Sequence, residues 1–146
     1  MPFWDAQRNA PLAPPVLAAV WALHSYAALS GGYVVWMALT IGFNPDEAVL
    51  AGIRLACAEG IAWGLRRRQS WALWLGLAGG VFGGLGLVGA ALAISHAGVS
   101  GLPLGVVTAA YSIASAVCLA LSGLLLARRD SRAVFGAPAG GPPPAA

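Results

Sequence analysis

Residues 44–68 read NPDEAVLAGIRLACAEGIAWGLRRR, an apolar helix pattern with formal charges inside it. Asn44 and Pro45 form a start signal, because Asn caps a helix N-terminus and Pro suits the first helical position. The apolar run that follows is interrupted by Arg54 and Glu59 and ends in three consecutive Arg residues. Every other long hydrophobic segment of the chain is free of formal charge, so this stretch is the place to look for both fold and function.

The composition points to lipid as the solvent of this chain. Of 146 residues, 59% are hydrophobic and 9% are charged, whereas soluble domains carry about 25% charged residues. The mean hydropathy is +0.77. The net charge of +3 comes with no basic stripe interleaved with aromatics, so we expect no nucleic-acid partner. The two Cys give no disulfide framework.

Three more segments are long enough to cross a bilayer, which takes about 20 apolar residues. Residues 16–43 contain no formal charge, and neither does the chain between Arg68 and Arg128. That second interval is too long for one span, and Pro103 is well placed to open a new helix within it. The sequence therefore predicts an all-α, four-transmembrane-helix bundle with an antiparallel up-down arrangement. Its helices are expected over residues 16–43, 45–65, 70–94 and 103–127.

The two ends of the chain are expected to lie outside this bundle. Residues 1–15 are short, mixed and Pro-containing, and we interpret them as a flexible lead-in. Residues 128–146 become rich in Pro, Gly and Ala with little to bury, and we expect a disordered cytoplasmic tail.

The distribution of Arg predicts the orientation. Seven Arg lie outside the predicted spans, and all fall before the first helix, between the second and third, or after the fourth. The connection between the first two helices carries Asp46 and Glu47 instead. Because short cytoplasmic loops collect Lys and Arg, we expect both termini in the cytoplasm. The all-Arg, Ala- and Gly-rich composition favours a bacterial source and therefore the cell inner membrane.

Counting helical rise predicts a polar layer inside the bundle. Arg54 lies ~13 Å and Glu59 ~21 Å along the second helix from its outer end. Counting back along the first helix and inward along the fourth brings Tyr33 and Tyr111 near the level of Arg54. It brings Tyr26, Ser30 and Ser115 near that of Glu59. The candidate intramembrane site therefore comprises Arg54, Glu59, Tyr33, Ser30, Tyr111 and Ser115.

Two interpretations of this polar site stay open. A charge at the bilayer centre costs roughly 2.5–3.5 kcal/mol on the insertion scale, so something must offset it. Arg54 and Glu59 are either a substrate, ion or proton site, or a structural polar contact between helices or to another subunit. The structural interpretation is favoured, because no motif supports the functional one.

Other side chains with chemical potential do not converge in the sequence. His24 is expected in the inner half of the first helix and His96 in an outer connection, so one chain cannot bring both to one ion. A neutral His24 bonded to a backbone or hydroxyl group is expected. Cys57 and Cys118 fall at similar depths, but buried Cys usually behaves as a small hydrophobe. We expect no metal, no cofactor and no catalytic activity.

The third helix carries an unusual number of glycines. Overlapping small-x-x-x-small pairs let helix backbones approach closely in a membrane. The predicted helix-packing residues are Gly76, Gly79, Gly80, Gly83 and Gly84.

For function, the sequence favours a small accessory or structural subunit of a larger membrane complex. The small size, the sparse chemistry and the glycine-rich helix all favour it. The alternative is a small homo-oligomeric transporter or channel with its polar site at Arg54 and Glu59. The expected partners are the lipid bilayer and either other membrane subunits or further copies of this chain.

Overall fold

The computed structural model describes residues 12–96 and 103–136, and every regular element in those ranges is helical. The elements are α2 (Pro14–Thr40), α3 (Pro45–Arg66), α4 (Ser70–Ala78), the π-helix η1 (Gly79–Gly83), α5 (Gly84–His96), α6 (Pro103–Ala127) and α7 (Arg129–Gly136). Helices α4, η1 and α5 follow one another without a break and together fill the place of the predicted third helix. The all-helical prediction is confirmed for the described residues.

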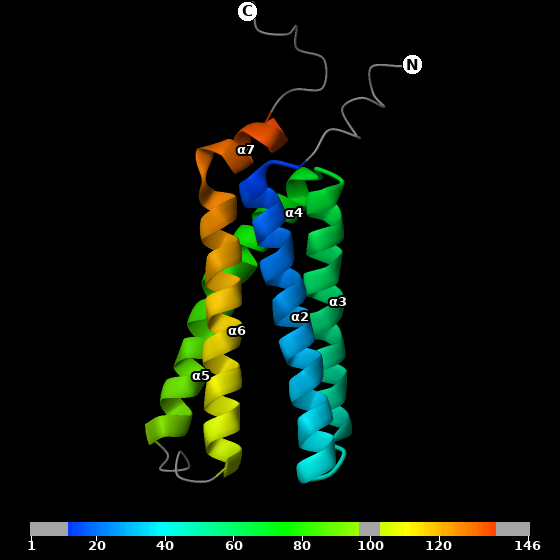
Figure 1. Ribbon diagram of the computed structural model, residues 1–146, viewed down its shortest axis with the longest axis vertical. Coiled ribbons are helices and arrows are strands. Elements are labelled where there is room, and N and C mark those ends of the chain that lie inside the picture. The colour runs from blue at the N-terminus through cyan, green and yellow to red at the C-terminus, as the bar shows by residue number, and fades with distance from the viewer. Residues whose placement is uncertain (1–11, 97–102, 137–146) are drawn as a thin grey trace, which may run out of the picture.

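The connection between α2 and α3 follows from local chemistry. Helix α2 ends where Gly42 adopts a φ of 118°, a left-handed conformation that glycine takes without steric cost. Asn44 then caps α3, because its side-chain oxygen accepts a hydrogen bond from the backbone N–H of Asp46 at 3.0 Å. Pro45 occupies the first turn, as predicted. The two helices are therefore joined by a tight turn and run antiparallel (Figure 1).

Three described helical stretches are long and apolar enough to cross a membrane: Pro45–Arg66, Ser70–Ala93 and Leu104–Ala127. They are compatible with a multi-pass membrane protein. Helix α2 is not among the three, although it contains no formal charge. Polar residues in its middle, such as His24, Tyr26 and Ser30, lower its mean hydropathy.

The helices form a row that is closed at one end (Figure 1). Helix α2 packs between α3 and α6, and α5 packs against the other side of α6. At the end where α7 lies, α4 contacts both α3 and α6 and closes the row into a bundle. Among the described elements, α3 makes no backbone contact with η1, α5 or α6. Away from the closed end, no backbone of the described residues therefore fills the space between α3 and η1.

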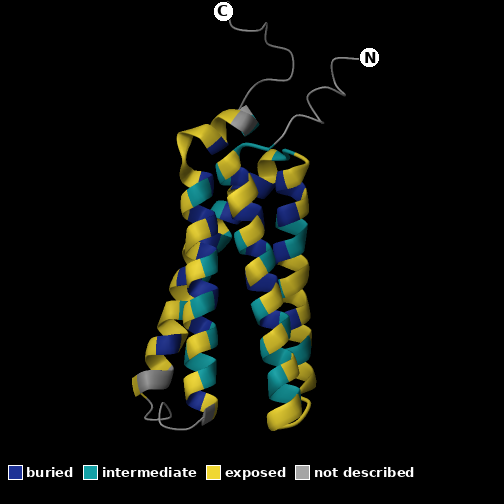
Figure 2. Ribbon diagram, in the orientation of Figure 1, coloured by how far each residue is buried: buried dark blue, intermediate teal, exposed yellow. Residues whose placement is uncertain are grey.

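The largest fully buried apolar residues lie near the closed end, and further buried residues recur along α6 (Figure 2). Those near the closed end are Val16, Val20, Leu65 and Leu126. Many other large apolar side chains are exposed, and Leu39 is 82% exposed. An apolar outer surface over a small interior is what lipid as a solvent permits.

Four of the five predicted packing glycines face α6. A Cβ on Gly80 would lie 2.7 Å from the Cα of Gly123, so the two backbones touch at this crossing. Gly83 and Gly84 lie against Leu119 and the α6 backbone, and Gly76 against Leu126. Gly79 differs, because a Cβ there would meet nothing within 4 Å.

The prediction for the C-terminal stretch is wrong for residues 129–136, which form α7. Ser131 is fully buried and donates a hydrogen bond to the carbonyl oxygen of Leu125 at 2.7 Å. Phe135 packs against the core. These contacts hold α7 against the bundle, although the α7 sequence has few apolar residues. At the other end, α2 begins two residues before the predicted start, and residues 1–11 and 137–146 lie outside the described part.

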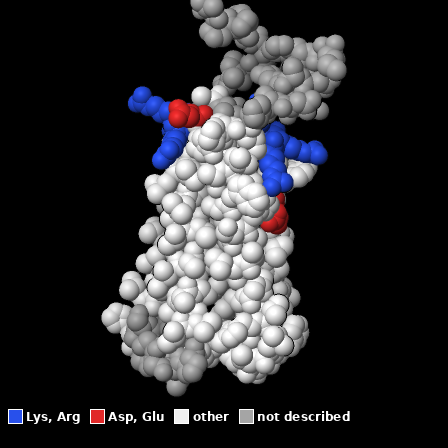
Figure 3. Space-filling view, viewed as in Figure 1, with Lys and Arg blue, Asp and Glu red and all other residues white. Residues whose placement is uncertain are grey.

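The two described Arg clusters lie at the same end of the molecule. Arg66–Arg68 follow α3, and Arg128, Arg129 and Arg132 lie at the end of α6 and in α7. Figure 3 shows the basic side chains gathered around the α7 end, with none on the lower part of that face. Asp46 and Glu47 begin α3 at the opposite end.

Candidate functional site

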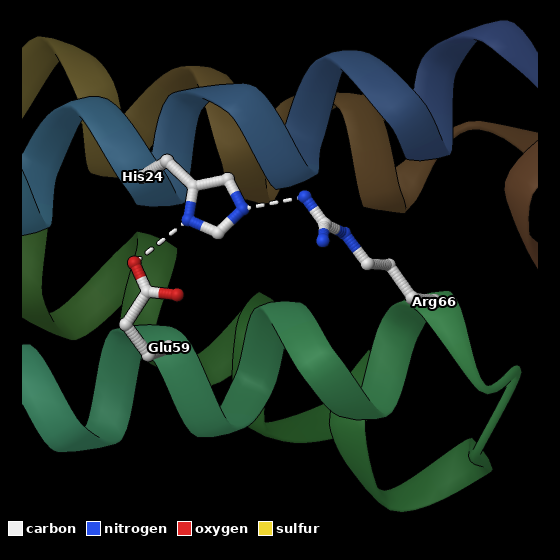
Figure 4. A network of polar contacts seen from close by, with 3 residues as sticks. All are labelled: His24, Glu59 and Arg66. Atoms are coloured by element: carbon white, nitrogen blue, oxygen red, sulfur yellow. Dashed lines mark hydrogen bonds and ion pairs between the residues drawn. The ribbon is translucent and has the colours of Figure 1, made fainter.

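The two charges within α3 have different surroundings. Glu59 contacts α2, where its Oε1 lies 2.7 Å from Nδ1 of His24. The other ring nitrogen of His24, Nε2, lies 2.8 Å from Nη2 of Arg66 (Figure 4). The Glu59 carboxylate and the Arg66 guanidinium, seven residues apart on one face of α3, are thus joined through an imidazole from the neighbouring helix.

The chemistry of Arg66 fixes the form of His24 that satisfies both contacts. A guanidinium has donors only, so Nε2 of His24 accepts the hydrogen bond from Arg66. The ring proton is then on Nδ1, which donates to the Glu59 carboxylate. The arrangement selects a neutral, Nδ1-protonated His24, because a proton on Nε2 would set two donors against each other at 2.8 Å.

The prediction for His24 is therefore half wrong. The contacts fit the expected neutral ring, but its partners are Glu59 and Arg66 instead of a backbone or hydroxyl group. Counting helical rise placed Tyr26 and Ser30 at the level of Glu59. It left out His24, which lies two residues before Tyr26, about half a helical turn nearer the start of α2. One signal in the sequence could have found it, since His24 is the one His in the first predicted span.

A second polar cluster joins α2 to α6. The rings of Tyr33 and Tyr111 stack with centroids 4.3 Å apart and an interplanar angle of 8°. The Tyr33 hydroxyl lies 3.0 Å from Oγ1 of Thr108, and Oγ of Ser30 lies 3.2 Å from the Tyr111 hydroxyl. Thr108 uses its own proton on the carbonyl oxygen of Leu104, so Tyr33 is the donor. The structure thus brings together Ser30, Tyr33 and Tyr111.

Ser115 does not join this cluster. Its side chain is fully buried, and its Oγ has no hydrogen-bond partner among the residues that the structure describes. A hydroxyl in an apolar interior loses free energy when it is unpaired. Nearby on the same helix, Ser122 donates to the carbonyl oxygen of Leu119 at 2.8 Å. The two serines therefore differ in how well their hydroxyls are satisfied.

Arg54 lies in neither polar cluster. It lines a cavity of about 230 Å³ between α3 and η1, with α2 and α6 at its floor. We call this cavity the α3–η1 groove, and its lining includes Leu23, Tyr26, Arg54, Cys57, Gly79 and Leu119. Arg54 is the one charged residue in the lining, and Tyr26 carries the one hydroxyl. The predicted juxtaposition of Arg54 with Tyr33 and Tyr111 is replaced by this apolar setting.

No carboxylate is recorded within ion-pair distance of Arg54 among the described residues, and Glu59 contacts His24 instead. Tyr26, within electrostatic reach of Arg54, is its polar neighbour in the groove. Arg54 is half-buried. A guanidinium stays charged in any protein environment, so the groove holds a permanent positive charge.

The remaining candidates are separate from these sites. Both Cys are free thiols, with Cys57 exposed at the groove and Cys118 half-buried in α6. Within residues 12–96 and 103–136, no group of three or more His, Cys, Asp or Glu could hold a metal ion. Comparisons with protein-family models, with curated proteins and with solved structures found no match to this chain.

Proposed function

We propose that the protein crosses the bacterial inner membrane four times, with both termini in the cytoplasm. Three apolar helices support this topology, and the uncharged α2 lies antiparallel between two of them. The two Arg clusters share one end of the molecule, and Asp46 and Glu47 lie at the other. A bias of this kind orients membrane proteins with Arg in the cytoplasm.

Cysteine labelling in intact cells tests this topology. In a chain with Cys57 and Cys118 changed to Ala, Asp46→Cys is expected to react with a membrane-impermeant maleimide. Gln69→Cys, next to the Arg cluster, is expected to react only after the cells are permeabilised. Labelling of Gln69→Cys in intact cells would reverse the proposed orientation.

Within that membrane, we propose that the protein is a non-catalytic accessory subunit of a larger complex. The observation that carries this proposal is Arg54, a permanent charge halfway along α3 with no carboxylate partner in the described chain. A charge at that depth costs about 2.5–3.5 kcal/mol, and a partner polypeptide would offset the cost. Glu59 differs from Arg54, because its carboxylate already accepts a hydrogen bond from His24, whose other ring nitrogen is bonded to Arg66.

The experiment is native mass spectrometry of the protein, extracted gently from its own membrane at its natural expression level. Co-extraction with other chains in a fixed ratio is the expected result. Arg54→Leu should lose those chains, whereas Arg129→Leu, an exposed charge outside the predicted spans, should keep them. A mass explained by copies of this chain alone would refute the accessory role and favour the homo-oligomeric transporter.

A further inference from the structure

One side of the α3–η1 groove is tightly packed, and the other side is open. On the packed side, Gly80 touches Gly123 of α6, so η1 is pinned against that helix. On the open side, Gly79 faces a space where a Cβ would meet nothing within 4 Å. Exposed Ile53 and Cys57 of α3 line the facing wall. The groove is therefore accessible from the lipid-facing surface of the molecule.

A π-helix is rare, and single π-turns occur frequently at functional sites. Here η1 spans Gly79–Gly83, and three of its glycines line the groove. The wall at η1 thus presents backbone and hydrogen atoms where side chains would otherwise stand. A side chain from outside can approach this wall closely.

The depth of Arg54 limits what can neutralise it. It lies ~13 Å along α3 from the outer end, and the hydrocarbon core is about 30 Å thick. A lipid phosphate stays at the headgroup level, away from this depth. A carboxylate on a helix that itself crosses the bilayer can sit there, and a guanidinium pairs with a carboxylate through two parallel hydrogen bonds.

Carboxylates of this chain are poorly placed to supply that charge. Glu59 is engaged by His24. Glu47 is seven residues before Arg54 on α3, ~10 Å nearer the outer end. A second copy in the same orientation would present the same groups at the same depths. Asp46 lies beside Glu47 at the outer end of α3, and Asp130 lies in α7 at the other end, so a different polypeptide is the better source of the complementary charge.

We propose that the α3–η1 groove binds a transmembrane helix of another polypeptide that carries an Asp or Glu at mid-bilayer depth. The inference rests on the proposed accessory role and adds the surface and the chemistry of the partner. The groove, at about 230 Å³, admits the acidic side chain and its neighbours, while the body of the partner helix lies against the exposed faces of α3 and η1.

The test uses defined peptides in place of the natural partner. The protein, labelled with a donor fluorophore, is placed in phosphatidylcholine vesicles with acceptor-labelled Leu/Ala-rich transmembrane peptides that carry Asp, Asn or Leu at their centre. Energy transfer is expected to show at least tenfold tighter binding of the Asp peptide than of the Leu peptide, about 1.4 kcal/mol.

Three variants separate the groove from general helix association. Arg54→Leu should remove the preference for the Asp peptide, and Arg54→Glu should transfer it to a peptide with a central Arg. Gly79→Leu places a side chain in the groove, where its Cβ meets nothing within 4 Å, and should weaken Asp-peptide binding about tenfold. Gly86→Leu is the matched control, because a Cβ at Gly86 also meets nothing within 4 Å but Gly86 lies outside the groove lining.

Equal binding of the three peptides would overturn the inference, and so would a preference for Asp that survives Arg54→Leu. Displacement of the Asp peptide by oleate, with fatty acid co-extracted from the native membrane only when Arg54 is present, would assign the groove to a lipid carboxylate and also overturn it. If the Asp peptide does not bind but other chains are co-extracted in an Arg54-dependent way, the groove proposal is rejected and the accessory role stands. Peptide binding without any co-extracted chain would reject the accessory role alone.

Discussion

Glu59 and Arg54 lie five residues apart on α3, yet within residues 12–96 and 103–136 Glu59 has a hydrogen-bond partner and Arg54 has no carboxylate partner. Glu59 faces α2, and the His24 imidazole links it to Arg66. Arg54 faces the α3–η1 groove, where the lining is otherwise apolar apart from Tyr26. A charge inside an apolar helix therefore says little by itself. What the neighbouring helix offers decides whether that charge stabilises the fold or is left for a ligand or partner.

Two adjacent glycines of η1 also differ, because Gly80 is tightly packed and Gly79 faces open space. The largest effect on stability is expected at Gly80. Gly80→Leu places its Cβ 2.7 Å from the Cα of Gly123. Overpacking typically costs 1–3 kcal/mol, and this position should exceed about 3 kcal/mol because backbone atoms cannot rotate away. Gly79→Leu should change the free energy of unfolding by less than about 1 kcal/mol. Tryptophan fluorescence during thermal unfolding in detergent compares the two variants, and equal loss in both would contradict the packing described.

A double-mutant cycle measures how strongly Glu59 and His24 interact. Glu59→Ala and His24→Ala are expected to show a coupling free energy of about 0.6–1.7 kcal/mol, the range found for hydrogen bonds between membrane helices. Arg54→Ala combined with His24→Ala should be additive to within about 0.5 kcal/mol. The free energies come from unfolding in mixed micelles. Coupling between Arg54 and His24 of the same size would remove the distinction between the two sites.

The contact between α2 and α6 should depend more on the stacked rings than on the hydroxyls. Tyr33→Phe keeps the stack on Tyr111 and loses one hydrogen bond, so a cost of about 0.6 kcal/mol is expected. Tyr33→Ala also loses the aromatic pair, which contributes a further 0.5–1.5 kcal/mol or so beyond the area it buries. The same unfolding measurement separates them. A Phe variant as unstable as the Ala variant would show that the hydroxyl contact to Thr108 dominates.

The smallest effects are expected at two buried serines of α6. Ser122→Ala loses a hydrogen bond to the Leu119 carbonyl oxygen and should cost no more than about 0.6 kcal/mol. Ser115→Ala removes a hydroxyl that has no partner among the described residues, so stability should stay unchanged or rise slightly. The midpoint of thermal unfolding is sufficient for this comparison. A clear loss of stability in Ser115→Ala would indicate a partner outside the described part of the chain.

The parts of the fold that local chemistry controls could be predicted from the sequence. The start of α3 at Pro45 with its Asn44 cap follows from residues adjacent to each other. The common level of Tyr33 and Tyr111 followed from helical rise alone, because each lies a fixed distance from a chain reversal. Rise is the same for every residue of a helix, so depth in the bundle is predictable.

Rotation about the helix axis is harder to predict than depth. The pairing of His24 with Glu59 depends on which faces of α2 and α3 meet, and that is a result of packing along the whole interface. Arg54 was expected beside Tyr33 and lies instead in the α3–η1 groove. The helix α7 was missed for a related reason, since the burial of Ser131 depends on the bundle end beneath it.

The π-helix has a consequence for the pattern of side chains along the continuous stretch α4–η1–α5. A π-turn corresponds to one extra residue in an otherwise regular α-helix, and each residue turns an α-helix by about 100°. Helices α4 and α5 are therefore out of phase, and no single periodic stripe describes the exposed sides of both. Deletion of one glycine within residues 79–83 would restore a continuous helical phase and rotate every side chain of α5 relative to α6. The number of residues in η1, and not only their glycine content, sets which face of α5 meets the rest of the protein.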